Sequence, residues 1–405
     1  MPSTLPEGDP APLDGALPSQ IMSRVGARPF GLYVHVPYCA SRCGYCDFNT
    51  YTASELGGAA SQASYARDAI TEIELARRVL GDAELPVATV FFGGGTPTLL
   101  ATADLAAMLR AIDDNFGLRA GAEVTIEANP ESVDAASLAQ LRAAGFTRLS
   151  LGMQSVAPHV LAVLDRRHTP GAPQRRVAEA YAAGFEHVSL DLIYGTPGES
   201  DDDWRASLAA AIEAAPDHIS AYALIVEAGT RLAARVRRGE LPMPDDDVLA
   251  DRYLIADEQL GSADFCWYEV SNWARTAGEC RHNLAYWRGD DWWGVGPGAH
   301  SHIGGLRWWN VKHPTAYAAR LASGSSPGHA RELLDDETRR VEDVMLRLRL
   351  AEGLDLRTLD DVGRKAAQAE ADAGLLDPSA LARGRALLTL RGRLLADGVV
   401  RRLLG

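Results

Sequence analysis

The stretch Tyr33-Val-His-Val-Pro-Tyr-Cys39-Ala-Ser-Arg-Cys43-Gly-Tyr-Cys46-Asp-Phe48 decides the fold of this chain. An alternating apolar run, typical of a strand, leads directly into three cysteines with CxxxCxxC spacing. An iron–sulfur cube normally takes four thiolates, and no fourth cysteine follows nearby, so one iron would stay open to a small molecule. We therefore expect Cys39, Cys43 and Cys46 to hold a [4Fe–4S] cluster at the end of a strand.

Two other uses of these cysteines fit less well. Five cysteines in 405 residues without a signal peptide indicate a reducing compartment, which disfavours disulfides. A structural zinc site needs a closed tetrahedral set, and a second CxxC pair is missing. His35 could complete such a set, but it precedes the loop within the strand pattern, where a packing role is commoner.

The composition excludes some partners. A net charge of −14 offers no basic field to attract phosphates, so we expect no nucleic-acid partner. No apolar stretch reaches the roughly 20 residues needed to cross a bilayer. The first 28 residues lack the basic start and apolar centre of a secretory signal and are rich in Pro, Gly, Ser and Ala. We expect a flexible tail and a cytoplasmic protein, with peripheral membrane contact and a homodimer left open.

Short apolar strands alternate with helical segments, which predicts an α/β fold with parallel strands. The expected strands are 32–36, 88–92, 123–128, 148–153, 187–193 and 218–225. The sequence at 144–152 resembles that at 183–191, and in both a Gly follows a helix and a strand begins at once. Such units build a doubly wound sheet or a barrel, and six of them favour a partial (β/α)6 barrel.

Polar residues follow these strands, at the edge where such folds gather their functional groups. Cysteines follow the first strand and Gly93-Gly94-Gly95-Thr96-Pro97 the second. The later strands end at Glu127, Gln154, Asp191 and close to Tyr222. Because polar groups are costly inside a core, their positions indicate a pocket.

The cysteine spacing in this setting resembles the radical S-adenosylmethionine (SAM) proteins, in which the open iron chelates SAM. The resemblance implies that the backbone of Gly94, Gly95 and Thr96 meets the SAM amino group, as in the family's GGTP element. Glu127 and Asp191 would bind a ribose or an ammonium group, and Gln154 would complete the hydrogen-bond set. Arg166 would bind the carboxylate, with Arg167 as a less favoured choice. A surface or inter-strand salt bridge is the structural alternative for these charged residues.

Further motifs narrow the resemblance. Tyr33 before the cysteine loop, which the resemblance adds to the cofactor-binding residues, occurs with Ile126-Glu-Ala-Asn-Pro, Gly152-Met-Gln-Ser and Asp191-Leu-Ile-Tyr-Gly. Together they are similar to the oxygen-independent coproporphyrinogen III oxidase family of porphyrin biosynthesis. Those oxidases carry a further cysteine at the position of Phe48, which puts oxidase activity in doubt here. The sister branch of HemW-type heme chaperones has CDF, as in this chain, and an HNxxYW motif that matches His282-Asn-Leu-Ala-Tyr-Trp287.

The segment from 265 to 310 concentrates seven tryptophans and three histidines. Flat aromatic faces and imidazole nitrogens suit a planar macrocycle with iron at its centre. The resemblance makes His282 the favoured ligand of heme b, with Asn283, Tyr286 and Trp287 beside it. His300, His302 and Cys280 rank below it, and a packing role is the alternative for each.

These observations divide the chain into a tail (1–28), a partial radical SAM barrel (29–265), an aromatic extension with the HNxxYW motif (266–334) and a small winged-helix-like domain (335–405). Within the last domain, 337–350 has helical periodicity, and 386–390 with 398–404 indicates a helix and a hairpin. We expect a heme chaperone that binds a [4Fe–4S] cluster, SAM and heme and delivers heme to an acceptor hemoprotein, with a respiratory hemoprotein as one candidate. The alternative is a SAM-dependent coproporphyrinogen III oxidase, and the sequence leaves open whether the protein is an enzyme.

Overall fold

The fold was analysed in a computed structural model that describes residues 7–56, 62–166 and 169–405. Six parallel strands lie side by side in sequence order, as expected: β2 (Phe30–Val36), β3 (Val87–Gly94), β4 (Leu118–Ala128), β5 (Arg148–Gln154), β6 (His187–Tyr194) and β7 (His218–Ala223). Each strand alternates between two faces, so one residue in two points into the barrel. The six predicted strands are therefore confirmed, with ends that differ by a few residues.

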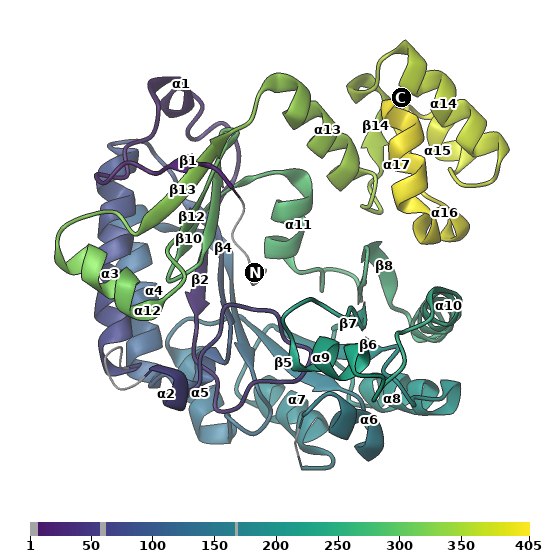
Figure 1. Ribbon diagram of the computed structural model, residues 1–405, viewed down its shortest axis with the longest axis horizontal. Helices are drawn as coiled ribbons and strands as arrows, with labels where there is room; N and C mark the ends of the chain where they lie inside the picture. Colours follow the sequence, from purple (N-terminus) through teal and green to yellow (C-terminus); the bar gives the residue numbers. More distant parts are fainter. Residues whose placement is uncertain (1–6, 57–61, 167–168) are drawn as a thin grey trace.

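Helices cover the outer face of these strands (Figure 1). They are α3 (Gln62–Leu80), α4 (Thr102–Phe116), α5 (Ala135–Ala143), α6 (Pro158–Val163), α7 (Ala172–Ala182) and α8 (Asp201–Glu213). Apolar residues recur on one side of each longer helix, for example Leu105, Met108 and Ile112 in α4, and join the main core. This layer of helices leaves the inner face of the strands free to form a cavity.

The sheet continues beyond both edges of the six strands. On one side β10 (Asp291–Val295) pairs in parallel with β2, followed by the antiparallel strands β11 (His300–Ile303), β12 (Leu306–Asn310) and β13 (Gly328–Leu333). On the other side β9 (Asn272–Ala274) and β8 (Cys266–Glu269) follow β7. The thirteen-stranded order runs from β1 to β8, so the barrel is open.

Helix α11 (Arg281–Arg288) belongs to the connection between these two edges. Its chain leaves β9 beside β7 and enters β10 beside β2, and Figure 1 shows α11 in the gap between the sheet and the last domain. Further helices before the last domain are α2 (Ala53–Leu56), α9 (Arg231–Arg237), α10 (Asp246–Ser262), α12 (Pro314–Ala322) and the 3-10 turn η1 (Pro97–Leu99). None of the described helices is both long and apolar enough to cross a membrane.

The expectation of a flexible tail is wrong for residues 7–28. Strand β1 (Asp9–Pro10) pairs with β13, and α1 (Ser19–Met22) places the side chain of Ile21 in the main core. Leu17 packs against the same core, and burial of these side chains offsets the entropy lost in ordering the segment. Residues 1–6 lie outside the described residues.

The C-terminal domain has a core of its own, which includes Val344, Leu354 and Val399. It contains α13 (Asp336–Arg347), β14 (Leu354–Asp355), η2 (Leu356–Thr358), α14 (Asp361–Asp372), α15 (Pro378–Ala382), β15 (Arg385–Ala386), α16 (Leu390–Leu394) and α17 (Ala396–Leu404). The helix and hairpin expected from 386–390 with 398–404 are not found as such, because 398–404 is part of helix α17 and only Ala386 belongs to a strand, β15. The buried residues Val399, Val400 and Leu403 of α17 follow helical spacing, and the two short strands pair elsewhere.

Candidate cofactor site

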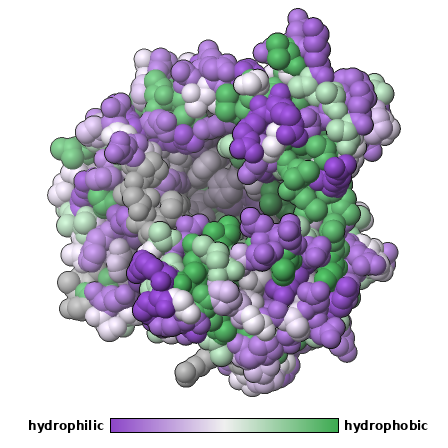
Figure 2. Space-filling view, turned by 45° about the vertical axis from the view of Figure 1, so that its right-hand side comes forward, coloured by the Kyte–Doolittle hydropathy of each residue, from purple (hydrophilic) through white to green (hydrophobic). Residues whose placement is uncertain are grey.

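A cavity of about 670 Å³ opens at the carboxyl ends of β2–β7 and extends inward along the barrel. Figure 2 shows the hollow at the centre of one face of the molecule, with hydrophobic residues along part of its border. Every strand-end residue expected to bind a cofactor lines this cavity except Tyr33. The liners that matter here are Cys39, Cys43, Cys46, Gly94, Gly95, Thr96, Glu127, Gln154, Arg166 and Asp191.

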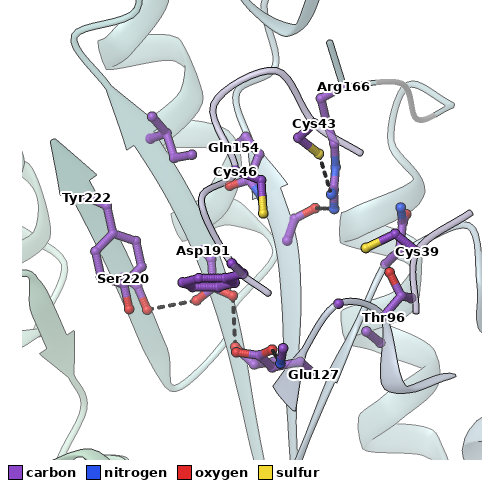
Figure 3. A pocket seen from close by; sticks show the side chains of 18 of the residues that line it. Cys39, Cys43, Cys46, Thr96, Glu127, Gln154, Arg166, Asp191, Ser220 and Tyr222 are labelled. Atoms are coloured by element: carbon purple, nitrogen blue, oxygen red, sulfur yellow. Dashed lines mark hydrogen bonds between the residues drawn. The ribbon is translucent and has the colours of Figure 1, made fainter. Parts of the chain in front are cut away.

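The three cysteine side chains border the same cavity from the loop after β2 (Figure 3). All three thiols are free and half-buried. Across residues 7–56, 62–166 and 169–405, no three Cys, His, Asp or Glu side chains are already gathered as a metal site. Burial raises the pKa of Cys39 to about 11 and also raises that of Cys46. A bound iron would supply the positive charge that these thiolates need.

Asn49 holds the far end of the cysteine loop in place. Its side-chain Nδ2 donates to the backbone carbonyls of Pro297 at 3.0 Å and Lys312 at 2.9 Å. The backbone carbonyl oxygen of Asn49 lies 2.9 Å from Nε2 of His35. Because that carbonyl can only accept, Nε2 of His35 carries the proton and Nδ1 accepts from the hydroxyl of Tyr33 at 2.9 Å. The loop is thus tied to β2 and to the segments that follow β10 and β12.

The glycines after β3 allow a close backbone approach. A Cβ on Gly95 would lie 2.4 Å from the carbonyl oxygen of Tyr38 and 3.0 Å from Sγ of Cys39. Gly94 has a φ of 110°, and a Cβ there would lie 2.7 Å from the ring of His35. Only glycine fits both positions, so the Gly-rich turn packs against the cysteine loop and exposes backbone to the cavity.

Two acids face each other across the base of this site (Figure 3). Glu127 accepts from the backbone N–H of Gly94 at 3.1 Å, and burial together with the charge of Asp191 raises its pKa to about 8. Asp191 accepts from the hydroxyls of Ser150 at 2.9 Å and Ser220 at 2.8 Å, and burial raises its pKa too. At pH 7 Glu127 therefore mostly carries a proton. One donor beside one acceptor suits a pair of sugar hydroxyls.

Gln154 and Arg166 complete the opposite wall. Gln154 adopts a φ of 64°, a left-handed conformation that is uncommon outside glycine and often marks a functional site. The guanidinium of Arg166 donates from Nη1 to Sγ of Cys43 at 3.5 Å and from Nη2 to the carbonyl of Gly152 at 3.1 Å. Its buried Nε has no hydrogen-bond partner within the described part of the chain.

These residues fit the cofactors that the sequence implies. Arg166 has a buried donor without a partner beside the cysteine loop, and a carboxylate ligand would satisfy it. Three thiols border a cavity that also holds exposed backbone of Gly95 and an acid pair. Tyr33 lies outside the lining residues because its hydroxyl bonds to His35 within β2. Arg167 lies outside the described residues.

Of the HNxxYW residues on α11, only Asn283 lines the cavity. Asn283 lines its inner end, together with Cys280. His282 is buried and stacked on Phe91, and its Nδ1 and Nε2 lie 2.8 Å from Thr89 Oγ1 and 2.9 Å from the hydroxyl of Tyr286. Burial lowers its pKa to about 4, so the ring is neutral.

The other candidates for heme ligation lie farther along the extension. Trp287 packs beside the core formed by Tyr268 and Leu350. The ring of His302 bonds to the carbonyl of Asp290, and the buried Nε2 of His300 has no partner among the described residues. The structure therefore brings Asn283 and Cys280 together with the cofactor residues, and keeps His282, Tyr286 and Trp287 in the packing beneath them.

Sequence reasoning missed several polar residues of the barrel interior. Ser150 and Ser220 bind Asp191, while Glu123 and Arg148 form an ion pair of 3.0 Å below them. Each lies two, four or six residues before a predicted strand-end residue on the same strand. The alternation of strand side chains is the signal that could have found them.

An open parallel barrel with a CxxxCxxC loop and a Gly-rich turn at its carboxyl edge defines a radical SAM protein. The chain matches the Radical SAM superfamily over residues 33–211. It is 57% identical to the Heme chaperone HemW of Mycobacterium tuberculosis over 93% of this chain and 95% of that protein. It is 34% identical to the Heme chaperone HemW of Synechocystis, over 83% and 82% respectively. The chain therefore belongs to the HemW family of radical SAM proteins.

A solved structure shares the fold. The Escherichia coli protein described as "Coproporphyrinogen III oxidase (HemN) … is a Radical SAM enzyme" aligns with a TM-score of 0.81 over 95% of this chain and 92% of that chain. Sequence identity to it is 24%. The similarity shows that the barrel, the extension and the C-terminal domain follow one architecture.

Proposed function

We propose that the protein is a heme chaperone that binds a [4Fe–4S] cluster, SAM and heme b and passes heme to an acceptor hemoprotein. One observation carries the proposal: α11, which bears the HNxxYW motif, forms the inner end of the cavity that the three cysteines border. The chaperone branch is thus favoured by the same segment that joins the cofactor site to the aromatic extension. The name of the 57% identical relative supports it.

The cofactor roles follow from the positions of the side chains. Cys39, Cys43 and Cys46 would hold three irons, and the open iron would bind SAM and supply a reducing electron. Arg166 would bind the SAM carboxylate, while Glu127 and Asp191 would orient the ribose. Gln154 and the backbone of Gly95 and Thr96 would close the polar surface around it.

Heme would bind beside α11. His282 would serve as the iron ligand through Nε2, which must first leave the hydroxyl of Tyr286. That hydrogen bond is worth about 1 kcal/mol net. Asn283, Tyr286 and Trp287 would flank the macrocycle. We also propose cytoplasmic residence, and that the acceptor is a hemoprotein.

An anaerobic heme titration of the reconstituted protein, followed at the Soret band, tests this function. We expect saturable one-to-one binding that weakens at least tenfold in His282→Ala. Tight binding unaffected by the substitution would place the ligand elsewhere. Absence of specific binding, with conversion of coproporphyrinogen III in the presence of SAM and a reductant, would instead establish the oxidase.

A further inference from the structure

A fully buried ion pair lies at the base of the barrel, below the cofactor residues. Nε of Arg148 on β5 lies 3.0 Å from Oε2 of Glu123 on β4, and both side chains are 1% exposed. Arg148 also lines the inner end of the cavity. The pair thus lies at the inner end of the cofactor cavity, below the cofactor residues.

Glu123 receives the start of α11. Its Oε2 accepts from the backbone N–H of Arg281 at 3.1 Å, and its Oε1 accepts from the N–H of His282 at 3.0 Å. The Cys280 thiol donates to Oε1 at 3.6 Å. The first N–H groups of a helix have no partner within the helix, so a carboxylate from a distant strand caps them here.

Arg148 holds the chain immediately before that helix. Its Nη2 donates to the carbonyls of Gly278 at 2.8 Å and Glu279 at 3.0 Å, and its Nη1 donates to Ser189 at 3.2 Å. The planar guanidinium spreads these donors at fixed angles, which a lysine could not reproduce. Five hydrogen bonds in total therefore fix 278–282 to β4 and β5: two to carbonyls, two from N–H groups and one from a thiol.

A net gain in folding stability does not explain why this position holds a buried ion pair. Burying two charges costs several kcal/mol each, and well-packed apolar side chains often do as well or better. What apolar side chains cannot do is cap the N–H groups of a helix and bind two carbonyls of the turn before it. The specific effect of the ion pair is to fix the position and orientation of α11.

We propose that Glu123 and Arg148 are positioning residues that set the HNxxYW helix at the inner end of the cofactor cavity and thereby preorganise it for heme. The proposal rests on the proposed function. Both residues touch the backbone of α11 or of the turn before it, and they act on heme through that helix rather than by contact with heme.

The test uses the reconstituted full-length protein and the double variant Glu123→Gln, Arg148→Met. Removing both charges avoids a lone buried charge, so the barrel should still fold. A second buried pair offers a matched control: Arg252 Nη1 lies 3.0 Å from Glu199 Oε2, with exposures of 6% and 0%, and joins α10 to the segment before α8. Glu199→Gln, Arg252→Met removes a similar pair far from α11.

Two readouts separate positioning from stability. The first is the ratio of dissociation constants for heme and SAM. We expect the heme affinity of the 123/148 variant to fall at least tenfold and its SAM affinity to fall much less. The 199/252 variant should keep its heme affinity even if its melting temperature falls. The second is amide hydrogen exchange across 278–288, which should speed up at least tenfold in the 123/148 variant alone.

The proposal would be overturned if heme affinity and SAM affinity fell by the same factor in the 123/148 variant and in the 199/252 variant. It would also be overturned if hydrogen exchange across 278–288 were unchanged in the 123/148 variant. The outcomes are distinguishable from failure of the proposed function. If the wild type binds no heme, the function fails, and the exchange measurement still decides whether the pair positions the helix. If heme binds equally well to wild type and the 123/148 variant, the function stands and the positioning role falls.

Discussion

The guanidinium of Arg166 crosses the end of β5 through space that Gly152 leaves free. Its Nη2 donates to the carbonyl of Gly152 at 3.1 Å, and a Cβ at position 152 would lie 2.7 Å from the same atom. Gly152 therefore leaves the space that Arg166 and the amide of Gln154 occupy, because Nε2 of Gln154 would lie 2.8 Å from the same Cβ. This relationship ties a motif seen in the sequence, Gly152-Met-Gln-Ser, to a cation on the next loop.

Gly152→Ala should displace Arg166 and weaken SAM binding. Loss of a hydrogen bond from a charged group costs about 1.5–3 kcal/mol, which is roughly a tenfold to hundredfold rise in the dissociation constant. Isothermal titration of the reconstituted protein with SAM measures it. Gly261→Ala, where a Cβ would meet nothing within 4 Å, is the matched control. Unchanged SAM affinity in Gly152→Ala would show that SAM binding does not depend on the present positions of Arg166 and Gln154.

Asn49→Ala should loosen the cysteine loop and shorten the life of the cluster. The substitution removes a buried hydrogen bond to Pro297 and a partly buried one to Lys312, and leaves both carbonyls without that donor. We expect iron to be lost to a chelator several times faster than from the wild type. Asn115→Ala on α4 also removes a side-chain bond to a carbonyl and should leave iron release unchanged. Equal rates in all three proteins would contradict the role of Asn49.

Glu72 should make the stability of the fold depend on pH. Burial raises its pKa from 4.5 to about 7, against the lowering effect of donors from Tyr317, Gly296 and Asn310. The folded state therefore holds a proton that the unfolded chain has released between these values. The stabilisation is complete below pH 4.5 and is lost as pH rises through about 7, a change on the order of 3 kcal/mol.

Urea unfolding of wild type and Glu72→Gln between pH 4.5 and 8 checks this prediction. The difference between the two proteins isolates Glu72 from other carboxyls with raised pKa values, such as Glu199. We expect the free energy of unfolding to fall more steeply with pH in the wild type than in the variant. Parallel curves would show that the pKa of Glu72 is not raised.

Arg393→Ala should loosen the C-terminal domain from the barrel. Arg393 lies 2.8 Å from Asp257 on α10, and its guanidinium stacks 4.2 Å from the ring centre of Trp267. Loss of a partly buried pair and a cation–π contact should cost about 1–2 kcal/mol locally. Hydrogen exchange of 336–405 should then rise. Arg357→Ala, whose exposed guanidinium pairs with Asp355 inside the same domain, should leave exchange unchanged.

The sequence alone predicted the elements whose pattern is local. Six parallel strands and the cysteine loop follow from alternation and spacing, and the strand-end rule placed Glu127, Gln154 and Asp191 in one cavity. The order of strands beyond the six was not predictable in the same way. Pairing of β10 with β2 joins residues about 260 positions apart, and no local pattern encodes it.

Errors arose where burial depends on distant partners. The segment 7–28 has the composition of a tail, but β1 pairs with β13 and Ile21 is buried in the main core. His282 has the sequence setting of a ligand, and its two nitrogens are satisfied by Thr89 on β3 and by Tyr286 one turn further along α11, so its role as a heme ligand stays a prediction. The positions of Glu123 and Arg148 become visible only when inward-facing residues of neighbouring strands are compared.

The pairing of β2 with β10 also constrains the order in which the chain can fold during synthesis. β2 is complete after 36 residues, but its second neighbour begins only at Asp291. Until then the strand that leads into the cysteine loop presents an unpaired edge, which invites association with other chains. A truncated product that ends before β10 would leave that edge uncovered and should aggregate.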